Sequence, residues 1–81
     1  MCRIRAKVKG GAIKGEKVAF IKASEGRIVE VSVASSQAGK GYVQAFEVTR
    51  DKDKVLVELP RESASGDWRL WIDKHQVLAA S

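Results

Sequence analysis

The stretch Lys54-Val-Leu-Val-Glu-Leu59, followed after residues 60–67 by Trp68-Arg-Leu-Trp-Ile72, decides the fold of this chain. Alternate side chains of a strand point to opposite faces, and both segments alternate in this way, so each is predicted to be a strand. The loop between them is rich in Ser, Gly, Asp and Glu, a composition typical of an exposed turn. A symmetric hairpin then forms a wholly apolar inner face with three cross-strand pairs: Leu59–Trp68, Val57–Leu70 and Val55–Ile72.

The same register gives this hairpin an outer face of different character. Its pairs there are Leu56–Trp71 and Glu58–Arg69. A shift of one residue would place charged side chains in the apolar rows, so the pattern specifies the register. We therefore predict that Trp68 belongs to the core and that Glu58 and Arg69 form a cross-strand ion pair.

The N-terminal stretch Arg3-Ile-Arg-Ala-Lys-Val-Lys9 alternates without interruption. This pattern predicts one half-buried strand, with Ile4, Ala6 and Val8 directed to the core. The opposite face of that strand carries only cationic side chains: Arg3, Arg5, Lys7 and Lys9.

A second hairpin is predicted where residues 17–22 and 27–33 flank Ser24-Glu25-Gly26. With Glu25 and Gly26 as the central turn residues, one face pairs apolar side chains and is expected to point inward. Its pairs are Phe20–Val31 and Val18–Val33. The other face is less apolar and is expected to point outward, with the pairs Ile21–Glu30 and Ala19–Ser32.

Residues 42–49 are predicted to form a further strand, although the alternation is imperfect. Val43 and Ala45 point to one face, whereas Phe46 and Val48 point to the other. A β-bulge near Ala45 and Phe46 would bring all four to the core side. Burial of the strand on both faces is the alternative.

The fold class predicted from these segments is all-β. Residues 73–76 form a tight turn before a last short apolar strand that begins with Val77-Leu78. Short strands separated by frequent turn signals, without a convincing helix, favour a small five- to six-stranded barrel or a rolled antiparallel sheet. A single-turn helix is expected before the last strand, and residues 1–81 are expected to form a single domain.

The C-terminal segment resembles the end of Src-homology-three-like small β-barrels. The shared features are a strand that contains two tryptophans (residues 68–72), one turn (residues 73–76) and a short apolar strand (residues 77–78). The resemblance implies architecture only. The acidic loop and the tyrosine-rich groove of the proline-binding members are absent, so no peptide-binding residues are implied.

Composition limits the classes of function. Fifteen Lys and Arg against ten Asp and Glu leave a net charge of +5, which favours nucleic acid or another polyanion as partner. The single cysteine excludes an intramolecular disulfide framework and fits a reducing, cytoplasmic compartment. No apolar run is long enough for a membrane helix, so no association with a membrane is expected.

The first candidate site is the cationic strand face, formed by Arg3, Arg5, Lys7 and Lys9, with Lys40 and Arg69 as possible auxiliaries. Charges at alternate positions of a strand are about 6.5–7 Å apart, a spacing on the scale of the phosphates of a nucleic-acid backbone. This face therefore suggests nucleic-acid or other polyanion binding. The alternative is that the charges protect an edge strand from pairing with another chain.

The second candidate site is the pair Leu56 and Trp71 on the outer face of the C-terminal hairpin. An exposed tryptophan beside a leucine suits contact with a protein partner or with a second copy of the chain. The alternative is that the surrounding turns cover both side chains. The second hypothesis is therefore a small accessory or assembly protein.

Motifs for catalysis or cofactor binding are not found. His75 is the only histidine, which excludes metal clusters built from several histidines. Asp51 and Asp53 alternate with lysines and lack the rest of a calcium loop, and Gly39-Lys-Gly41 lacks the spacing of a phosphate-binding loop. We expect a non-catalytic binding module without metal or cofactor.

Overall fold

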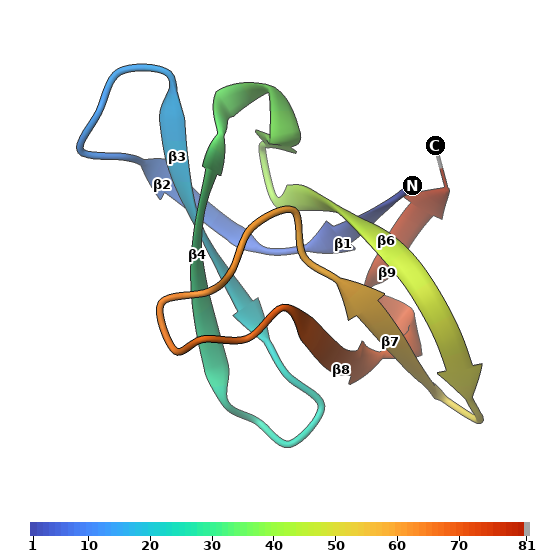
Figure 1. The fold of residues 1–81 in the computed structure, drawn as a ribbon. Helices are drawn as coiled ribbons and strands as arrows, with labels where there is room; N and C mark the ends of the chain where they lie inside the picture. The colour runs from blue at the N-terminus through green and yellow to red at the C-terminus, as the bar shows by residue number, and fades with distance from the viewer. Residues whose placement is uncertain (81) are drawn as a thin grey trace.

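Two antiparallel sheets enclose one apolar core in the computed structural model, which describes residues 1–80 (Figure 1). Within these residues the strands are β1 (Cys2–Arg5), β2 (Lys7–Gly10), β3 (Glu16–Lys22), β4 (Ile28–Ala34), β5 (Ala38–Gly39), β6 (Tyr42–Asp51), β7 (Lys54–Glu58), β8 (Arg69–Asp73) and β9 (Val77–Ala80). Two single-turn 3₁₀ helices, η1 (Ser35–Gln37) and η2 (Lys74–Gln76), lie between strands. The predicted all-β class is confirmed, and η2 is the turn expected before the last strand.

The strands are divided between a larger sheet and a smaller one. The larger sheet has the order β8-β7-β6-β1-β9, with β5 beside β6, and the smaller sheet has the order β2-β3-β4. The two sheets do not close into a barrel, so this part of the predicted architecture is not formed. Figure 1 shows the smaller sheet on the left of the molecule and β6 to β9 on the right, with the two chain ends close together.

The N-terminal segment passes from one sheet to the other at Ala6, so the prediction of one unbroken strand is wrong. The backbone N–H of Ala6 donates to the carbonyl of Gly41 at 3.1 Å, outside either ladder. The predicted alternation continues through the break, because Ile4 and Ala6 are buried while Arg5 and Lys7 are exposed. Because buried and exposed residues still alternate across Ala6, the sequence pattern does not reveal that the strand is interrupted there.

The C-terminal hairpin has the predicted register. The ladder between β7 and β8 contains the pairs Val55–Ile72, Leu56–Trp71, Val57–Leu70 and Glu58–Arg69. The N–H of Leu59 donates to the carbonyl of Trp68 at 2.8 Å, which extends the pairing as predicted. The prediction that Trp68 belongs to the core is nevertheless wrong, because this side chain is 55% exposed.

Residues 60–67 explain the exposure of Trp68, because this loop folds back onto β4 and closes the end of the core. The N–H of Ala64 donates to the carbonyl of Glu30 at 2.8 Å, and the Ser63 side chain is buried. Asp67 accepts hydrogen bonds from Arg27 Nη1, in the loop between β3 and β4, at 3.0 Å and from Ser65 Oγ at 2.7 Å. The hydrogen bonds from Arg27, Ser65 and Ser63 lower the pKa of Asp67 to about 2. The loop is thus a structured contact between the sheets rather than a free turn.

The hairpin of β3 and β4 is shifted by one residue from the predicted register. Its pairs include Ala19–Val31, Ile21–Val29 and Phe20–Glu30. The N–H of Gly26 donates to the carbonyl of Ala23 at 2.9 Å, and Gly26 has a φ of 97°. The loop therefore has three residues, a turn followed by a left-handed glycine, instead of the two central residues assumed above. The shift reverses β3, so that Ala19 and Ile21 are buried and Phe20 is half-exposed.

Strand β6 follows neither of the two predicted arrangements. Its bulge lies between Glu47 and Thr49, beyond the predicted position. Val43 and Ala45 are buried, but Phe46 is 48% exposed and Val48 is 41% exposed. The outer face of this strand therefore carries large apolar side chains in contact with solvent.

Candidate functional site

A groove with a volume of about 980 Å³ lies over β2 and β3 and is bordered by η2 and Gly41. We call it the basic groove. Its lining includes four cationic side chains, Arg5, Lys7, Lys9 and Lys22. Two apolar side chains, Phe20 and Ile28, lie among them.

The sheet register places these side chains on one face. Lys7 pairs directly with Phe20 across β2 and β3, and Lys9 pairs with Val18. Lys22 follows Phe20 by two positions on β3 and pairs with Ile28 on β4. Because paired residues project to the same side of a sheet, Lys7 and Lys22 lie beside Phe20 on this face, and Glu30 of β4 pairs with the ring from the other side.

The opposite wall of the groove is attached to β3 by Gln76. Its side chain is 5% exposed, its Nε2 donates to the carbonyl of Lys22 at 3.0 Å, and its Oε1 accepts from the N–H of Asp73 at 3.2 Å. These bonds hold η2 beside the end of β3 and place Asp73 and His75 at the groove. The Gln76 side chain thus joins the two sheets at the site.

The groove is electrostatically unbalanced. Among the described residues that line it, Asp73 is the one carboxylate against four cations. None of the ion pairs within residues 1–80 involves any of these four cations, whereas Arg27, Arg50, Arg61 and Arg69 each have a carboxylate partner. The Lys9 ammonium lies 5.7 Å from the centre of the Phe20 ring. The unpaired cations are therefore available to an anionic ligand.

The other predicted cations lie outside this lining. The Arg3 guanidinium stacks over the Tyr42 ring, 4.7 Å from its centre. Tyr42 also pairs with Arg5 across β1 and β6, so this stack lies next to a residue that lines the groove.

Lys40 is exposed and precedes Gly41 at the border of the groove. Arg69 lies on β8, where its Nε donates to Glu58 Oε1 at 3.2 Å as the sequence predicted. The structure thus gathers Arg5, Lys7 and Lys9 and separates them from Arg69.

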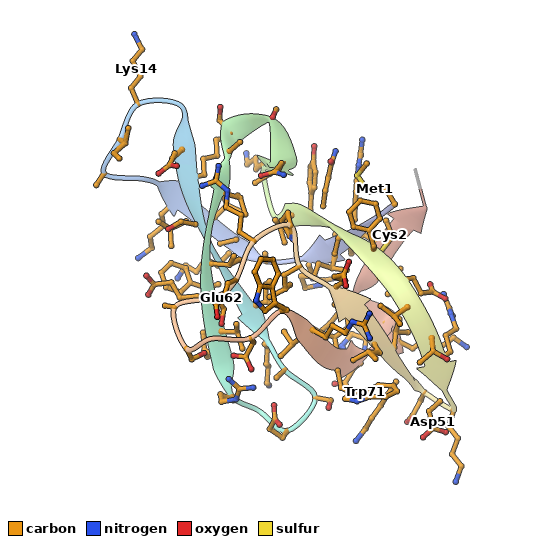
Figure 2. All side chains as sticks on the ribbon, viewed as in Figure 1. Met1, Cys2, Lys14, Asp51, Glu62 and Trp71 are labelled. Carbon is orange, nitrogen blue, oxygen red and sulfur yellow. The ribbon has the colours of Figure 1, made fainter. Side chains whose placement is uncertain are left out.

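The second candidate pair lies on the outer face of the larger sheet. Trp71 is 37% exposed and pairs with the half-buried Leu56, and Figure 2 shows its indole extending away from the ribbon. Phe46 is on the same face, opposite Glu58. We call Phe46, Leu56 and Trp71 the apolar patch. The exposed Phe46 was not predicted to belong to it.

Among the groove residues that the sequence pattern did not indicate, Phe20, Lys22 and Ile28 come from β3 and β4. All three were assigned to the hairpin of residues 17–33, whose assumed register directed Phe20 to the core. The signal that could have found them is the position of Gly26, since a three-residue loop that ends in glycine reverses the faces of β3. Val29, Val31 and Val33 are buried and pair in that register with residues 21, 19 and 17.

Other chemistry has little support in the described part of the chain. Among residues 1–80 no three His, Cys, Asp or Glu side chains lie together as a metal site requires, and no helix has the length and apolarity to cross a bilayer. Cys2 is buried in β1, and burial raises the pKa of its thiol, opposite to the activation of a nucleophile. Comparisons of the chain with protein-family models, curated proteins and solved structures found no significant match.

Proposed function

We propose that this chain is a non-catalytic binding module that holds a polyanion, with nucleic acid as the leading candidate, in the basic groove. One observation carries the proposal: Arg5, Lys7, Lys9 and Lys22 line one groove, and none of the ion pairs within residues 1–80 involves them. Cations that serve only to solubilise a surface need not converge in this way. These side chains would neutralise the phosphates that bind there and so release the cations condensed on the nucleic acid.

The resemblance to Src-homology-three-like barrels is part of the same proposal. The larger sheet places β1 between β6 and β9, and η2 immediately precedes β9. We propose that this sheet is an open relative of such small barrels. The hairpin of β3 and β4, together with β2, would then be an addition between β1 and β6 that supplies the floor of the groove.

The salt dependence of binding tests the proposal. A labelled 15-nucleotide single-stranded DNA or RNA, titrated by fluorescence anisotropy at several salt concentrations, is expected to bind most tightly at low salt. If all four cations contact phosphates, the slope of log K against log salt is expected to be about −3. An uncharged peptide nucleic acid of the same sequence is the control and is expected not to bind. Absence of binding at about 50 mM salt, or a slope near zero, would contradict the proposal.

Self-association through the apolar patch is a second candidate function. The patch contains two exposed aromatic side chains, Phe46 and Trp71, and the Glu58–Arg69 ion pair lies beside them. Because this pair presents both signs of charge, a second copy related by a two-fold axis can place Arg69 opposite Glu58. Two copies of the patch can therefore face each other with opposite charges in contact, whereas two copies of the basic groove would repel each other.

Sedimentation velocity tests this second candidate. If the patch associates, the average mass is expected to rise between about 10 and 500 µM, within the weak range of dimer affinities, and Trp71→Ala is expected to remove the increase. Trp68→Ala is the matched control, because Trp68 is 55% exposed and lies outside the patch. A monomer at all concentrations, or equal behaviour of the two variants, would reject self-association through this patch.

A further inference from the structure

We infer that the ligand of the basic groove is a single-stranded nucleic acid, one of whose bases stacks on Phe20 while its phosphates contact the surrounding lysines. The inference rests on the proposed function and makes it more specific. It is based on the position of Phe20, a half-exposed aromatic ring that lines the groove beside Lys7, Lys9 and Lys22.

The placement of Phe20 is not required by the core. The core is filled from β3 by Ala19 and Ile21, which are fully buried, and Phe20 projects to the other face. A ring on a sheet face offers a flat apolar surface, and base–aromatic stacking is tolerant of sequence because every base has such a face. Phosphates do not stack on an aromatic ring, so the ring would not contribute to a site that binds phosphates alone.

The lysines lie close enough to Phe20 to contact the phosphates that adjoin a stacked base. Lys7 lies directly across the ladder from Phe20, and Lys22 lies two residues further along β3. Two residues of a strand advance by about 6.5–7 Å, which is on the scale of one nucleotide of an extended backbone. The groove volume of about 980 Å³ admits a base together with its sugar and phosphate.

The surroundings of Phe20 also indicate the side from which the backbone approaches. Glu30 pairs with Phe20 on β4, opposite to Lys7 on β2, and Glu30 does not line the groove. Phosphates are therefore repelled from the β4 side and attracted to the β2 side. Lys9 contacts the ring at 5.7 Å in the free protein, and an exposed contact of this length is weak enough to be exchanged for a base.

A duplex does not satisfy the same arrangement. The faces of its internal bases are stacked on each other within the helix, so away from the helix ends Phe20 could reach only an unpaired base. Inorganic polyphosphate and sulfated polysaccharides use the cations alone. The aromatic ring among the lysines therefore favours a single strand over these other polyanions.

The inference is tested by anisotropy at about 50 mM salt with three probes of equal length: oligo-dT, an abasic strand with the same number of phosphates, and a blunt DNA duplex. The wild-type protein is expected to bind oligo-dT about five- to hundredfold more tightly than the abasic strand. Phe20→Leu is expected to remove that difference without weakening abasic binding, and Phe20→Trp is expected to retain it. Thermal unfolding of each variant checks that the fold is kept.

The outcomes separate this inference from the proposed function. If oligo-dT and the abasic strand bind equally, or if Phe20→Leu weakens both by the same factor, base stacking on Phe20 is overturned while polyanion binding stands. Tighter binding of the duplex than of oligo-dT also overturns it. If none of the three probes binds, both the inference and the proposed function are overturned.

Discussion

Ile21→Ala is expected to reduce the free energy of unfolding by about 2–5 kcal/mol, the usual range for removing a large aliphatic side chain from a core. Ile21 is completely buried on β3 and pairs with the buried Val29. A domain of this length has a total stability of roughly 4–12 kcal/mol. The substitution is therefore expected to remove a large part of the stability, measured by urea unfolding followed by circular dichroism.

Ile13 provides the matched control, because the same substitution there removes the same atoms from a side chain that is 65% exposed. Ile13→Ala is expected to change the stability by no more than about 0.5 kcal/mol. Phe20→Leu is expected to be similarly mild. If Phe20→Leu destabilised the protein more than Ile21→Ala, the register of β3 and β4 described above would be wrong.

The two hairpins show why one register could be predicted and the other could not. In the C-terminal hairpin Glu58 and Arg69 oppose each other only in the correct register, and a shift would bury one of them. On β3, by contrast, Val18 and Phe20 on one face are as apolar as Ala19 and Ile21 on the other. Because both faces of β3 are apolar, the length of the loop decides which face is buried. The three-residue loop depends on the left-handed conformation of Gly26.

The exposure of Trp68 shows a second limit of the sequence pattern. Its pairing with Leu59 was correctly predicted, yet pairing in a ladder does not ensure that another layer covers the side chain. The cover at this end of the core comes from residues 60–67. The N–H of Ala64 holds this loop to Glu30 of β4, and Asp67 holds it to Arg27 in the loop between β3 and β4. A contact between residues forty positions apart cannot be read from local alternation.

The candidate site was predictable only in part for the same reason. Alternation along residues 3–9 correctly placed Arg5, Lys7 and Lys9 on one exposed side. Much of the remaining lining comes from β3, β4 and η2, and the Gln76 hydrogen bond to Lys22 holds η2 beside β3. The sequence therefore indicated the charge of the site, whereas its groove and its aromatic ring depend on tertiary contacts.

Charge reversal within the groove is expected to have the largest effect on binding. Lys7→Glu combined with Lys9→Glu removes two of the four cations and introduces repulsion beside Phe20. Loss of two phosphate contacts is expected to make the slope of log K against log salt shallower by about 1.4. The affinity for single-stranded DNA at about 50 mM salt is expected to fall at least about tenfold, which is about 1.4 kcal/mol.

The control distinguishes the groove from the overall charge of the protein. Lys14 and Lys52 occupy exposed turns outside the groove lining, and Figure 2 shows Lys14 extending from the tip of the β2–β3 loop. Lys14→Glu with Lys52→Glu lowers the net charge of +5 by the same amount. If binding depends on the groove, this control is expected to lose at most a few-fold in affinity, since at about 50 mM salt surface charges are screened beyond about 14 Å. Equal losses in the two double variants would mean that the whole surface, rather than the groove, attracts the polyanion.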